Sequence, residues 1–574
     1  MHQSTFPGYL GAMVLKKSVK GWICCLLGGA CILSLLVVAL NQPKDGEGES
    51  APVTFSMQSG FYNDAFYLEL DAGKNDIYYT LDSSDPDTDS IRYTGPIHIK
   101  DASENGNVYS LIEDVSPYND VEMLEKNGLS RLYEYKLPQQ PVDKATVVKA
   151  VSVDDKGNCS RVIEAVYFVG FKDKKGYDGI NIMTITTDPD NLFGRENGIY
   201  VMGKTFDDNA KDGIIQYEVN NANALKANYR QKGREWERKA TIQCFDPDRD
   251  IIFTGDYGIR IQGNTTRARL PKSLNLYARK EYGPSSFDTG ELFSPYNNLK
   301  SLNLHTSLNE TMFKDYLACE FIDGLDVACR KYVPCALFLD GEYWGVYWLS
   351  PRFEADYMGQ LFGVEEKNLF EIKQNRIEIG NEEDRTLLDE LVEYITGNDM
   401  SLAENYQCAC EMMDMQSYID YFASEIYIAN TDWPEFNQAM WRTKYKANDT
   451  YSDCKWRWIL FDVDMSMEVK YAQRSLLNNA INRDAVFASL MDNEGFVSKL
   501  KQKLLELAAD TFASEKVDVF IDDYKALMAD PMALHYQRFN GNDMTFEDFI
   551  QGCEETRTFF HDRQKYILQE MREE

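Results

Sequence analysis

Hydrophobic and polar residues alternate in short runs between residues 53 and 170. The runs FYLEL, DIYYTLD, PIHI, TVVKAVSV and VIEAVYFVG are separated by Gly, Asp, Ser and Pro. Short runs of this kind, interrupted by turn residues at such spacing, are typical of the strands of a β-sandwich. The pattern therefore predicts a small domain made of strands in this part of the chain.

The pattern changes along the rest of the chain. Between residues 180 and 350, segments such as INIMTITTD, YGIRIQG, SLNLYAR, CALFLDG and GVYWLS predict strands, and FKDYLACEFIDGL predicts a helix because its apolar residues recur at i, i+4 spacing. After about residue 383 the pattern is mostly helical, as in RTLLDELVEYITG. Strands followed by helices predict a β-rich lobe and then a helical lobe.

Residues 22–40 are 19 consecutive residues without a charged side chain. At 1.5 Å per residue this is about the length that crosses a hydrocarbon core of roughly 30 Å. Three lysines precede the segment and KDGEGES follows it, so the positive-inside rule places the N-terminus in the cytoplasm and the rest of the chain outside. We favour an uncleaved signal anchor. A cleaved signal peptide and a lipoprotein cut before Cys31 are the alternatives.

Composition narrows the possible partners. The chain has 92 acidic and 60 basic side chains, a formal net charge of −32 at pH 7. Nucleic acids are held by clusters of Lys and Arg, so we expect neither DNA nor RNA as the main partner. A phosphate compound is negatively charged and would be repelled by an acidic protein. To bind one, this chain would need a metal ion or a local pocket of basic side chains.

Several common kinds of site are absent from the sequence. The twelve Cys include three in the apolar segment, and the other nine are scattered without a CxxC pair, which argues against a disulfide scaffold. The five His are too far apart for a zinc pair, and no GxSxG, GxGxxG or Walker A motif occurs. Chemistry built from carboxylates and a divalent metal remains open.

Two segments carry carboxylates at spacings that suit phosphoryl transfer. In NTDWPEFN, Asp432 precedes Asn437 by five positions, the spacing that separates the proton-accepting Asp from the Mg²⁺-binding Asn in protein kinases. In WRWILFDVDMSM, an apolar strand ends in Asp462 and Asp464, which period-two geometry places on one face, where a cation would relieve their repulsion. The alternatives are capping of turns around Pro434 and a solvated strand end.

A third segment, YGIRIQGNTTRARLPKSLNLYARKEYG, combines a tight turn with basic side chains. Gly263 and Thr265 suit a turn whose backbone N–H groups face phosphates, and Arg267 and Lys272 supply positive charge in an acidic protein. Glu320 lies at the border of the apolar stripe of the predicted helix, so we expect it to be partly buried. A Lys272–Glu320 pair would mirror the lysine–glutamate pair of kinases; unrelated surface charges are the alternative.

Together these motifs resemble a known family. GIRIQGNTTRARLPKSLNLYARKEYG, FKDYLACEFIDGL, FLDGEYWGVYWLS, KNLFEIK, NTDWPEFN and WRWILFDVDMSM, in this order, resemble the spore-coat protein H (CotH) kinase family over roughly 180–574. The resemblance implies an atypical protein-kinase fold that transfers the γ-phosphoryl group of ATP to Ser or Thr of a protein, using Mg²⁺ or Mn²⁺. The strands of 53–170 resemble the chitobiase/β-hexosaminidase C-terminal-like module, an immunoglobulin-like β-sandwich, which implies a spacer.

The resemblance assigns a role to each residue of the three segments. It implies that Asp432 is catalytic, that the metal ligands are Asn437, Asp462 and Asp464, and that the nucleotide is held by Lys272, Glu320, Arg267, Gly263 and Thr265. The chain departs from the family at two places. Ser350-Pro351 stands where members usually have a Glu, and Met467-Glu468 stands where they usually have a Gly.

We therefore expect an α+β chain with a cytoplasmic tail (1–21), a transmembrane signal anchor (22–40), a linker (41–52), a β-sandwich (53–170) and a two-lobe kinase-like domain (171–574). The expected function is that of a single-pass, membrane-tethered Ser/Thr protein kinase, with most of the chain at the cell surface. The alternative is a non-catalytic cell-surface or spore-coat protein that recognises a protein or a glycan. A glycoside hydrolase that uses two carboxylates is a third possibility.

Overall fold

The computed structural model describes residues 50–129, 136–211, 214–215, 222, 225–307, 309–539 and 544–573. The expected cytoplasmic tail and signal anchor, and most of the expected linker, lie outside these residues. Among the helices of the described residues, none combines the length and the apolar character needed to cross a membrane.

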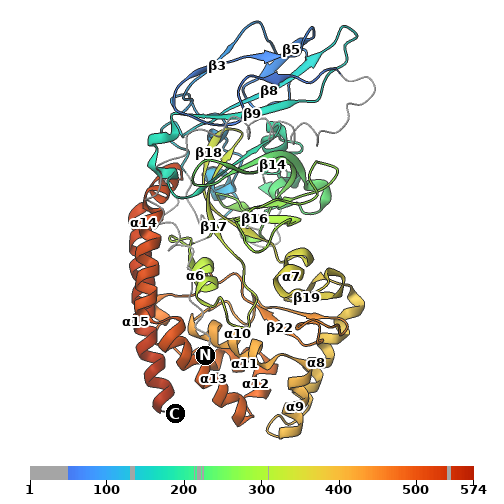
Figure 1. Ribbon diagram of the computed structural model, residues 1–574. Coiled ribbons are helices and arrows are strands. Elements are labelled where there is room, and N and C mark those ends of the chain that lie inside the picture. Colours follow the sequence, from blue (N-terminus) through green and yellow to red (C-terminus); the bar gives the residue numbers. More distant parts are fainter. Residues whose placement is uncertain are drawn as a thin grey trace, which may run out of the picture.

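The N-terminal strands form the upper layer in Figure 1. A five-stranded sheet of order β2-β9-β8-β5-β6 lies against the two-stranded sheets β3-β7 and β1-β4, with Leu68, Val148 and Tyr167 buried between them. The other face of β8 and β9 packs on the next layer through Val166 and Phe168. The strands are β1 (Thr54–Phe55), β2 (Gly60–Tyr62), β3 (Phe66–Leu68), β4 (Leu70–Asp71), β5 (Asp76–Thr80), β6 (Ile91–Arg92), β7 (Ile97–Ile99), β8 (Thr146–Val153) and β9 (Ile163–Val169).

The second layer is a closed barrel. Its order is β10-β13-β14-β15-β16-β18-β17, and the parallel pairing of β10 with β17 closes it, while every other neighbouring pair is antiparallel. Alternate residues such as Ile185, Ile242, Leu276 and Leu337 fill its buried core. The strands are β10 (Asn181–Thr186), β13 (Arg238–Phe245), β14 (Ile251–Ile261), β15 (Leu274–Tyr277), β16 (Ser301–His305), β17 (Val333–Leu339) and β18 (Glu342–Pro351).

The third layer is mostly helical, as the sequence predicts, around a four-stranded sheet of order β20-β19-β21-β22. Its strands are β19 (Leu369–Lys373), β20 (Arg376–Ile379), β21 (Ala439–Thr443) and β22 (Arg457–Ile459). Its helices are α7 (Ala355–Phe362), α8 (Thr386–Gly397), α9 (Ala403–Met412), α10 (Met415–Tyr427), α11 (Leu477–Arg483), α12 (Ala485–Leu490), α13 (Glu494–Glu506), α14 (Ser514–Arg538) and α15 (Phe546–Glu573). The chain is thus a mixed α+β protein, as predicted.

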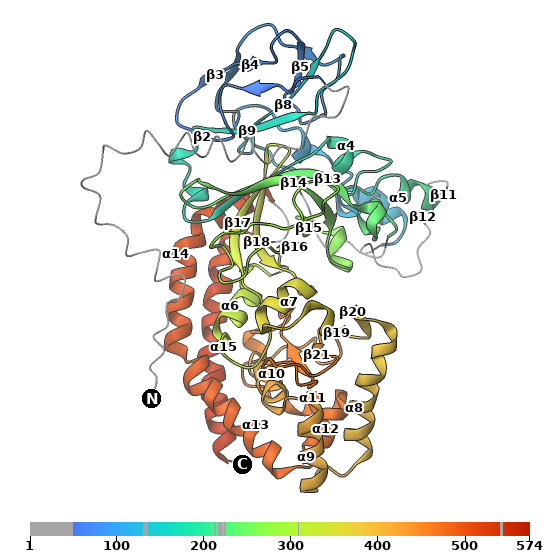
Figure 2. The ribbon, with the colours of Figure 1, turned by 45° about the vertical axis from the view of Figure 1, so that its right-hand side comes forward.

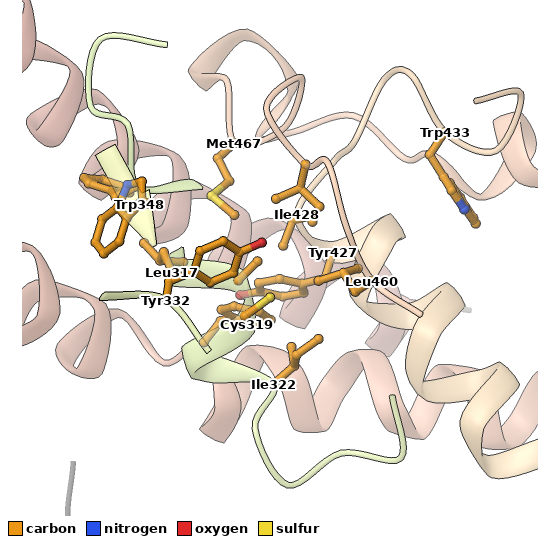
Figure 3. Packing of buried hydrophobic residues seen from close by; sticks show 14 of the residues in the cluster. Leu317, Cys319, Ile322, Tyr332, Trp348, Tyr427, Ile428, Trp433, Leu460 and Met467 are labelled. Carbon is orange, nitrogen blue, oxygen red and sulfur yellow. The ribbon is translucent and has the colours of Figure 1, made fainter. Parts of the chain in front are cut away.

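Two features join the barrel to the helical layer. Helices α14 and α15 run side by side along both layers, as the two views of the ribbon show (Figures 1 and 2). Helix α6 (Lys314–Phe321) packs its buried Leu317 and Cys319 in one core with Ile428 and Met467, which belong to two loops of the helical layer (Figure 3). The position of these loops therefore depends on α6.

Candidate functional site

Two loops of the helical layer lie side by side and hold the carboxylates that the sequence singles out. One loop follows α10 and the other follows β22. The Thr431 N–H donates to the carbonyl of Met465 at 3.1 Å, and the Met467 N–H donates to the carbonyl of Ile428 at 2.8 Å. The Asn437 side-chain amide donates to the carbonyl of Asp462 at 3.2 Å. The structure thus brings together the two residues predicted to be metal ligands from separate motifs.

The four-stranded sheet explains this meeting. Lys373 at the end of β19 pairs with Ala439 at the start of β21, and Ala439 pairs with Ile459 at the end of β22. Asn437 lies just before β21 and Asp462 lies just after β22, so both emerge at the same end of the sheet. Lys373 lies at that end too.

The backbone of both loops is held in an uncommon conformation. Asn437 and Asp462 each have a φ of 59°, Ala429 has 55° and Met467 has 58°. Residues other than Gly adopt this left-handed region only when their surroundings hold them there, and such residues cluster at functional sites. The prediction that Asp462 and Asp464 extend a strand is therefore wrong: β22 ends at Ile459, and a turn follows.

Asp462 and Asp315 form an acidic pair at this turn. Water reaches Asp462, but the surrounding protein raises the pKa of its carboxyl to about 6, and the charges of Asp315 and Asp464 add to this shift. Burial likewise raises the pKa of Asp315 to about 6. The Asp315 carboxylate accepts the Val463 N–H at 2.7 Å and lies 3.8 Å from His305 Nε2. A cation bound here would relieve the repulsion between the carboxylates.

Asp464 acts on this pair through its charge and is hydrogen-bonded to the segment that follows β16. Its Oδ1 accepts hydrogen bonds from the hydroxyl of Ser307 at 2.8 Å and from the amide of Asn309 at 2.9 Å. The Lys314 ammonium holds the same turn by donating to the carbonyls of Asp464 at 3.2 Å and Ser466 at 2.7 Å. Asp464 thus contributes charge to the site while neutral donors occupy its side chain.

Asp432 is half-buried and carries a carboxylate that accepts no hydrogen bond from the residues that the structure describes. Its backbone N–H donates to the Asn430 side chain at 3.3 Å. The Asn430 amide in turn donates to Glu425 at 2.9 Å, and both of these side chains are fully buried. A buried pair therefore fixes the backbone of Asp432 and leaves its carboxylate open to a substrate.

The predicted phosphate-binding turn is held together by its own cations. Gly263 has a φ of 105°, and a Cβ there would lie 2.2 Å from the Thr266 hydroxyl, so the turn requires glycine. The buried Arg267 donates to the carbonyls of Gly263 at 2.7 Å and Gln231 at 2.8 Å. Thr265 is exposed at the start of the 3-10 helix Thr265–Ala268. Arg267 therefore stabilises the loop through these hydrogen bonds.

The Lys272 side chain forms its hydrogen bonds within the protein. It is completely buried, its ammonium donates to the carbonyls of Arg267 and Arg269, and it lies 4.0 Å from the centre of the Tyr229 ring. Glu320 is exposed, and the nearest opposing charge is that of Lys331. The Lys272–Glu320 pair predicted from the sequence is therefore wrong, whereas partial burial of the Glu320 carboxyl raises its pKa, as its predicted position at the border of the apolar stripe implies. The helix α6 ends at Phe321 and presents Glu320 to solvent, away from the barrel interior.

A cavity of about 60 Å³ is lined by residues of the turn, Thr266 and Arg269. Ser307 and Asn309, which donate hydrogen bonds to Asp464, also line it. Burial lowers the pKa of Arg269, and the charge of Asp464 acts against this shift. The predicted turn and the aspartates therefore flank one region of the molecule.

Residues 259–567 match the family described as CotH kinase protein, which is more than half of the chain. The chain belongs to the CotH kinase protein family. Residues 67–167 match the family described as Fn3 associated. This match lies within the part that resembles the chitobiase-like module and gives it a different description.

Other comparisons add little to the family match. No curated protein matches the sequence. Among solved structures, the chain matches the crystal structure of the proinflammatory kinase CtkA of Helicobacter pylori with 12% sequence identity and a TM-score of 0.20. The match covers 49% of this chain and 94% of that chain.

Membership of the CotH kinase family implies ATP and a divalent metal in general terms, so the donor atoms can be tested against such a metal. Among the described residues, no group of three or more His, Cys, Asp or Glu is arranged to hold a metal ion. Mg²⁺ in phosphoryl-transfer sites uses one or two carboxylates together with substrate phosphates. The Asp462 carboxylate and the Asn437 amide fit such a shared site, in which hard oxygen atoms of protein and substrate complete the coordination.

The structure adds residues to this CotH-family site that the sequence motifs did not single out. Asp315 and Glu425 are acidic, and Lys373 is basic. The Lys373 ammonium lies 3.6 Å from the centre of the Phe461 ring, next to Asp462. Burial, with the charge of Arg330, lowers the pKa of Lys373 to about 8, and the charge of Asp462 opposes this shift. The motif KNLFEIK contains Lys373, but its role depends on pairing with β21, which no local pattern indicates.

Proposed function

We propose that the protein is a membrane-tethered, Mg²⁺-dependent kinase that transfers the γ-phosphoryl group of ATP to Ser or Thr hydroxyls of a protein. The observation that carries the proposal is the meeting of Asn437 with Asp462. The loop of Asn437 also carries Asp432, whose carboxylate accepts no hydrogen bond from the described residues. The sequence pattern predicts Asp432, Asn437 and Asp462 separately. The register of the four-stranded sheet brings Asn437 and Asp462 to the same end of that sheet.

In this proposal Asp432 is the catalytic base. Its carboxylate accepts the proton of the acceptor hydroxyl while the hydroxyl oxygen forms a bond to the γ-phosphorus and the bond to the leaving ADP oxygen breaks. The Glu425–Asn430 pair keeps the backbone of Asp432 in place. Asp462 and Asn437 would hold Mg²⁺, which supplies positive charge to the phosphates when bound. Asp315, which binds the Val463 N–H, positions the loop of Asp462.

One departure from the family pattern is consistent with an intact site. Met467 stands where members usually have a Gly, yet it adopts the left-handed conformation that Gly favours, and its N–H binds the carbonyl of Ile428 at 2.8 Å. The loop therefore keeps its shape despite the substitution. This favours a working kinase over the non-catalytic binding protein that is the alternative.

The test is phosphoryl transfer by the full chain in detergent, with labelled ATP, Mg²⁺ or Mn²⁺ and a panel of Ser/Thr-containing proteins. We expect Asp432→Asn and Asp462→Asn to lower transfer by at least about 100-fold. Asp389→Asn, at an exposed position on α8, is the matched control and should retain activity. If the wild type neither transfers phosphate nor binds ATP, and both site variants match it, the non-catalytic alternative stands.

The membrane anchor and the orientation need their own experiment. Residues 22–40 lead us to propose a single span with the described residues outside the cell. Protease treatment of intact cells should then remove the described part of the chain, and permeabilised cells serve as the control. Complete protection in intact cells would overturn this orientation, and release of the chain by a salt wash would overturn the anchor.

A further inference from the structure

Two cations whose charges act on the acidic pair, Lys373 and Arg330, form no ion pair with any residue that the structure describes. The Lys373 ammonium forms neither a hydrogen bond nor an ion pair with any residue that the structure describes, and its contact is the Phe461 ring. The Arg330 guanidinium lies 4.7 Å from the centre of the Phe353 ring. Its Nε is buried and has no hydrogen-bond partner among the described residues. In a chain with a net charge of −32, two cations without a carboxylate in contact are unusual.

The cations of the predicted phosphate turn are already engaged. Lys272 and Arg267 donate to main-chain carbonyls of their own loop and of Gln231. To reach a ligand, Lys272 would have to leave the carbonyls that accept its hydrogen bonds, and each carbonyl left buried without a donor is unfavourable. Positive charge for a ligand is therefore available at Lys373 and Arg330, whose charges act on Asp315.

The surroundings of Lys373 favour an anion. Arg330 is the nearest like charge and lowers the pKa of Lys373, so the two cations repel each other. The carboxyl of Glu371, two residues earlier on the same strand, does not neutralise them: it is buried, burial raises its pKa to about 8, and its Oε2 has no hydrogen-bond partner in the described residues. An anionic group placed between Lys373 and Arg330 would remove the repulsion.

We propose that Lys373, with Arg330 beside it, is the cation that contacts the phosphate groups of the bound nucleotide, in the role that the sequence assigns to Lys272. The proposal rests on the proposed kinase function. It places the phosphate-binding cation on β19 of the helical layer, next to Asp462, and leaves Lys272 as a residue that stabilises the barrel. Lys373 would contact the same phosphates that share Mg²⁺ with Asp462 and Asn437.

The first experiment maps the lysine directly, without measuring activity. An acyl-phosphate derivative of ATP is added to the full wild-type chain. The ε-amine of a lysine near the phosphates attacks the acyl carbon and forms an amide. The bond between the acyl carbon and the γ-phosphate oxygen breaks, and free ATP is the leaving group. Mass spectrometry of the digest should find label on Lys373 that excess ATP prevents. Lys367, which is exposed and paired with Glu365, should be labelled equally with and without ATP.

The second experiment measures what the charge contributes to affinity. Binding of ADP and of adenosine, each with Mg²⁺, is measured by calorimetry for the wild type, Lys373→Met, Lys373→Arg and the control Lys367→Met. We expect Lys373→Met to weaken ADP binding by about 10- to 100-fold and to leave adenosine unchanged, because a charge-assisted hydrogen bond to phosphate is lost. Lys373→Arg should recover most of the affinity.

The outcomes separate this inference from the proposed function. If the wild type binds ADP but Lys373→Met binds it equally well, or if ATP protects Lys272 and not Lys373, the assignment of Lys373 is overturned and the kinase proposal stands. If the wild type binds no nucleotide and ATP protects no lysine, both fall. If Lys373→Met fails to fold, the assignment of Lys373 is still tested by the labelling of the wild type and by ADP binding to the Lys373→Arg variant.

Discussion

Glu425 offers a test of how the site is built, because the fold keeps its carboxyl neutral. The side chain is fully buried on α10, Oε2 accepts the Asn430 amide, and Oε1 has no hydrogen-bond partner among the described residues. Burial raises its pKa from the ordinary 4.5 to about 8, and the charges of Asp315 and Asp462 act in the same direction. The folded chain therefore holds a proton at neutral pH that the unfolded chain releases.

The sign and size of the effect follow from proton linkage. Because the folded state binds the extra proton, the contribution of Glu425 to stability is complete below pH 4.5 and is lost as the pH rises toward 8. At pH 7 the loss is about 3 kcal/mol, at 1.36 kcal/mol for each pH unit above 4.5. Glutamine has nearly the same shape, can accept the Asn430 bond and does not titrate. Glu425→Gln should therefore be more stable than the wild type at pH 7–8 and nearly equal to it at pH 5.

The assay is urea unfolding of the full chain followed by tryptophan fluorescence at pH 5, 6, 7 and 8, with EDTA present to exclude metal. The measured quantity is the difference in unfolding free energy between variant and wild type, and we expect it to grow by about 3–4 kcal/mol from pH 5 to pH 8. Glu393→Gln, at an exposed position on α8, should show no such growth. A difference that stays within about 1 kcal/mol across this range, or that shrinks as the pH rises, would refute the reasoning.

Three further substitutions test the framework around the site. Arg563→Leu should lower the free energy of unfolding by at least about 3 kcal/mol, because the buried guanidinium donates to carbonyls of α10 and of the segment before α11; a thermal midpoint equal to that of the wild type would contradict this. Lys272→Met should lose about 1–3 kcal/mol by leaving the carbonyls of its loop without a donor, and chemical denaturation measures it. Gly263→Ala should speed hydrogen exchange in the turn, because the new Cβ meets the Thr266 hydroxyl; unchanged exchange would show that the turn tolerates a side chain.

The sequence predicts much of the fold and the centre of the site for physical reasons. The strand and helix periods are local properties, so the change from strands to helices along the chain is visible without a structure. Asp432 and Asn437 are predicted from their spacing within one short loop, and Asp462 is predicted from the two carboxylates that follow an apolar run, because phosphoryl transfer restricts residue types and spacing. The structure brings Asn437 and Asp462 together, and their roles as metal ligands stay a prediction.

What the sequence could not predict depends on long-range pairing. The closure of the barrel joins β10 to β17, and the position of Lys373 depends on its register with β21. The burial of Lys272 is hidden for a similar reason, since a lysine near a turn has the same local pattern whether its ammonium faces a ligand or the carbonyls of its own loop. The left-handed conformation of Met467 is also set by its neighbours, because its side chain alone would disfavour it.

The closure of the barrel also has a consequence for how the protein is made. Strand β10 lacks one of its two neighbours until β17 has been synthesised, roughly 150 residues later. At a ribosomal rate of about 5–20 residues per second, this leaves an apolar strand edge without its partner for roughly 8–30 s. Unpaired strand edges of this kind promote association between nascent chains. The barrel should therefore depend on chaperone protection during translation, and slowing translation between β10 and β17 should lower the yield of folded protein more than slowing it after β18.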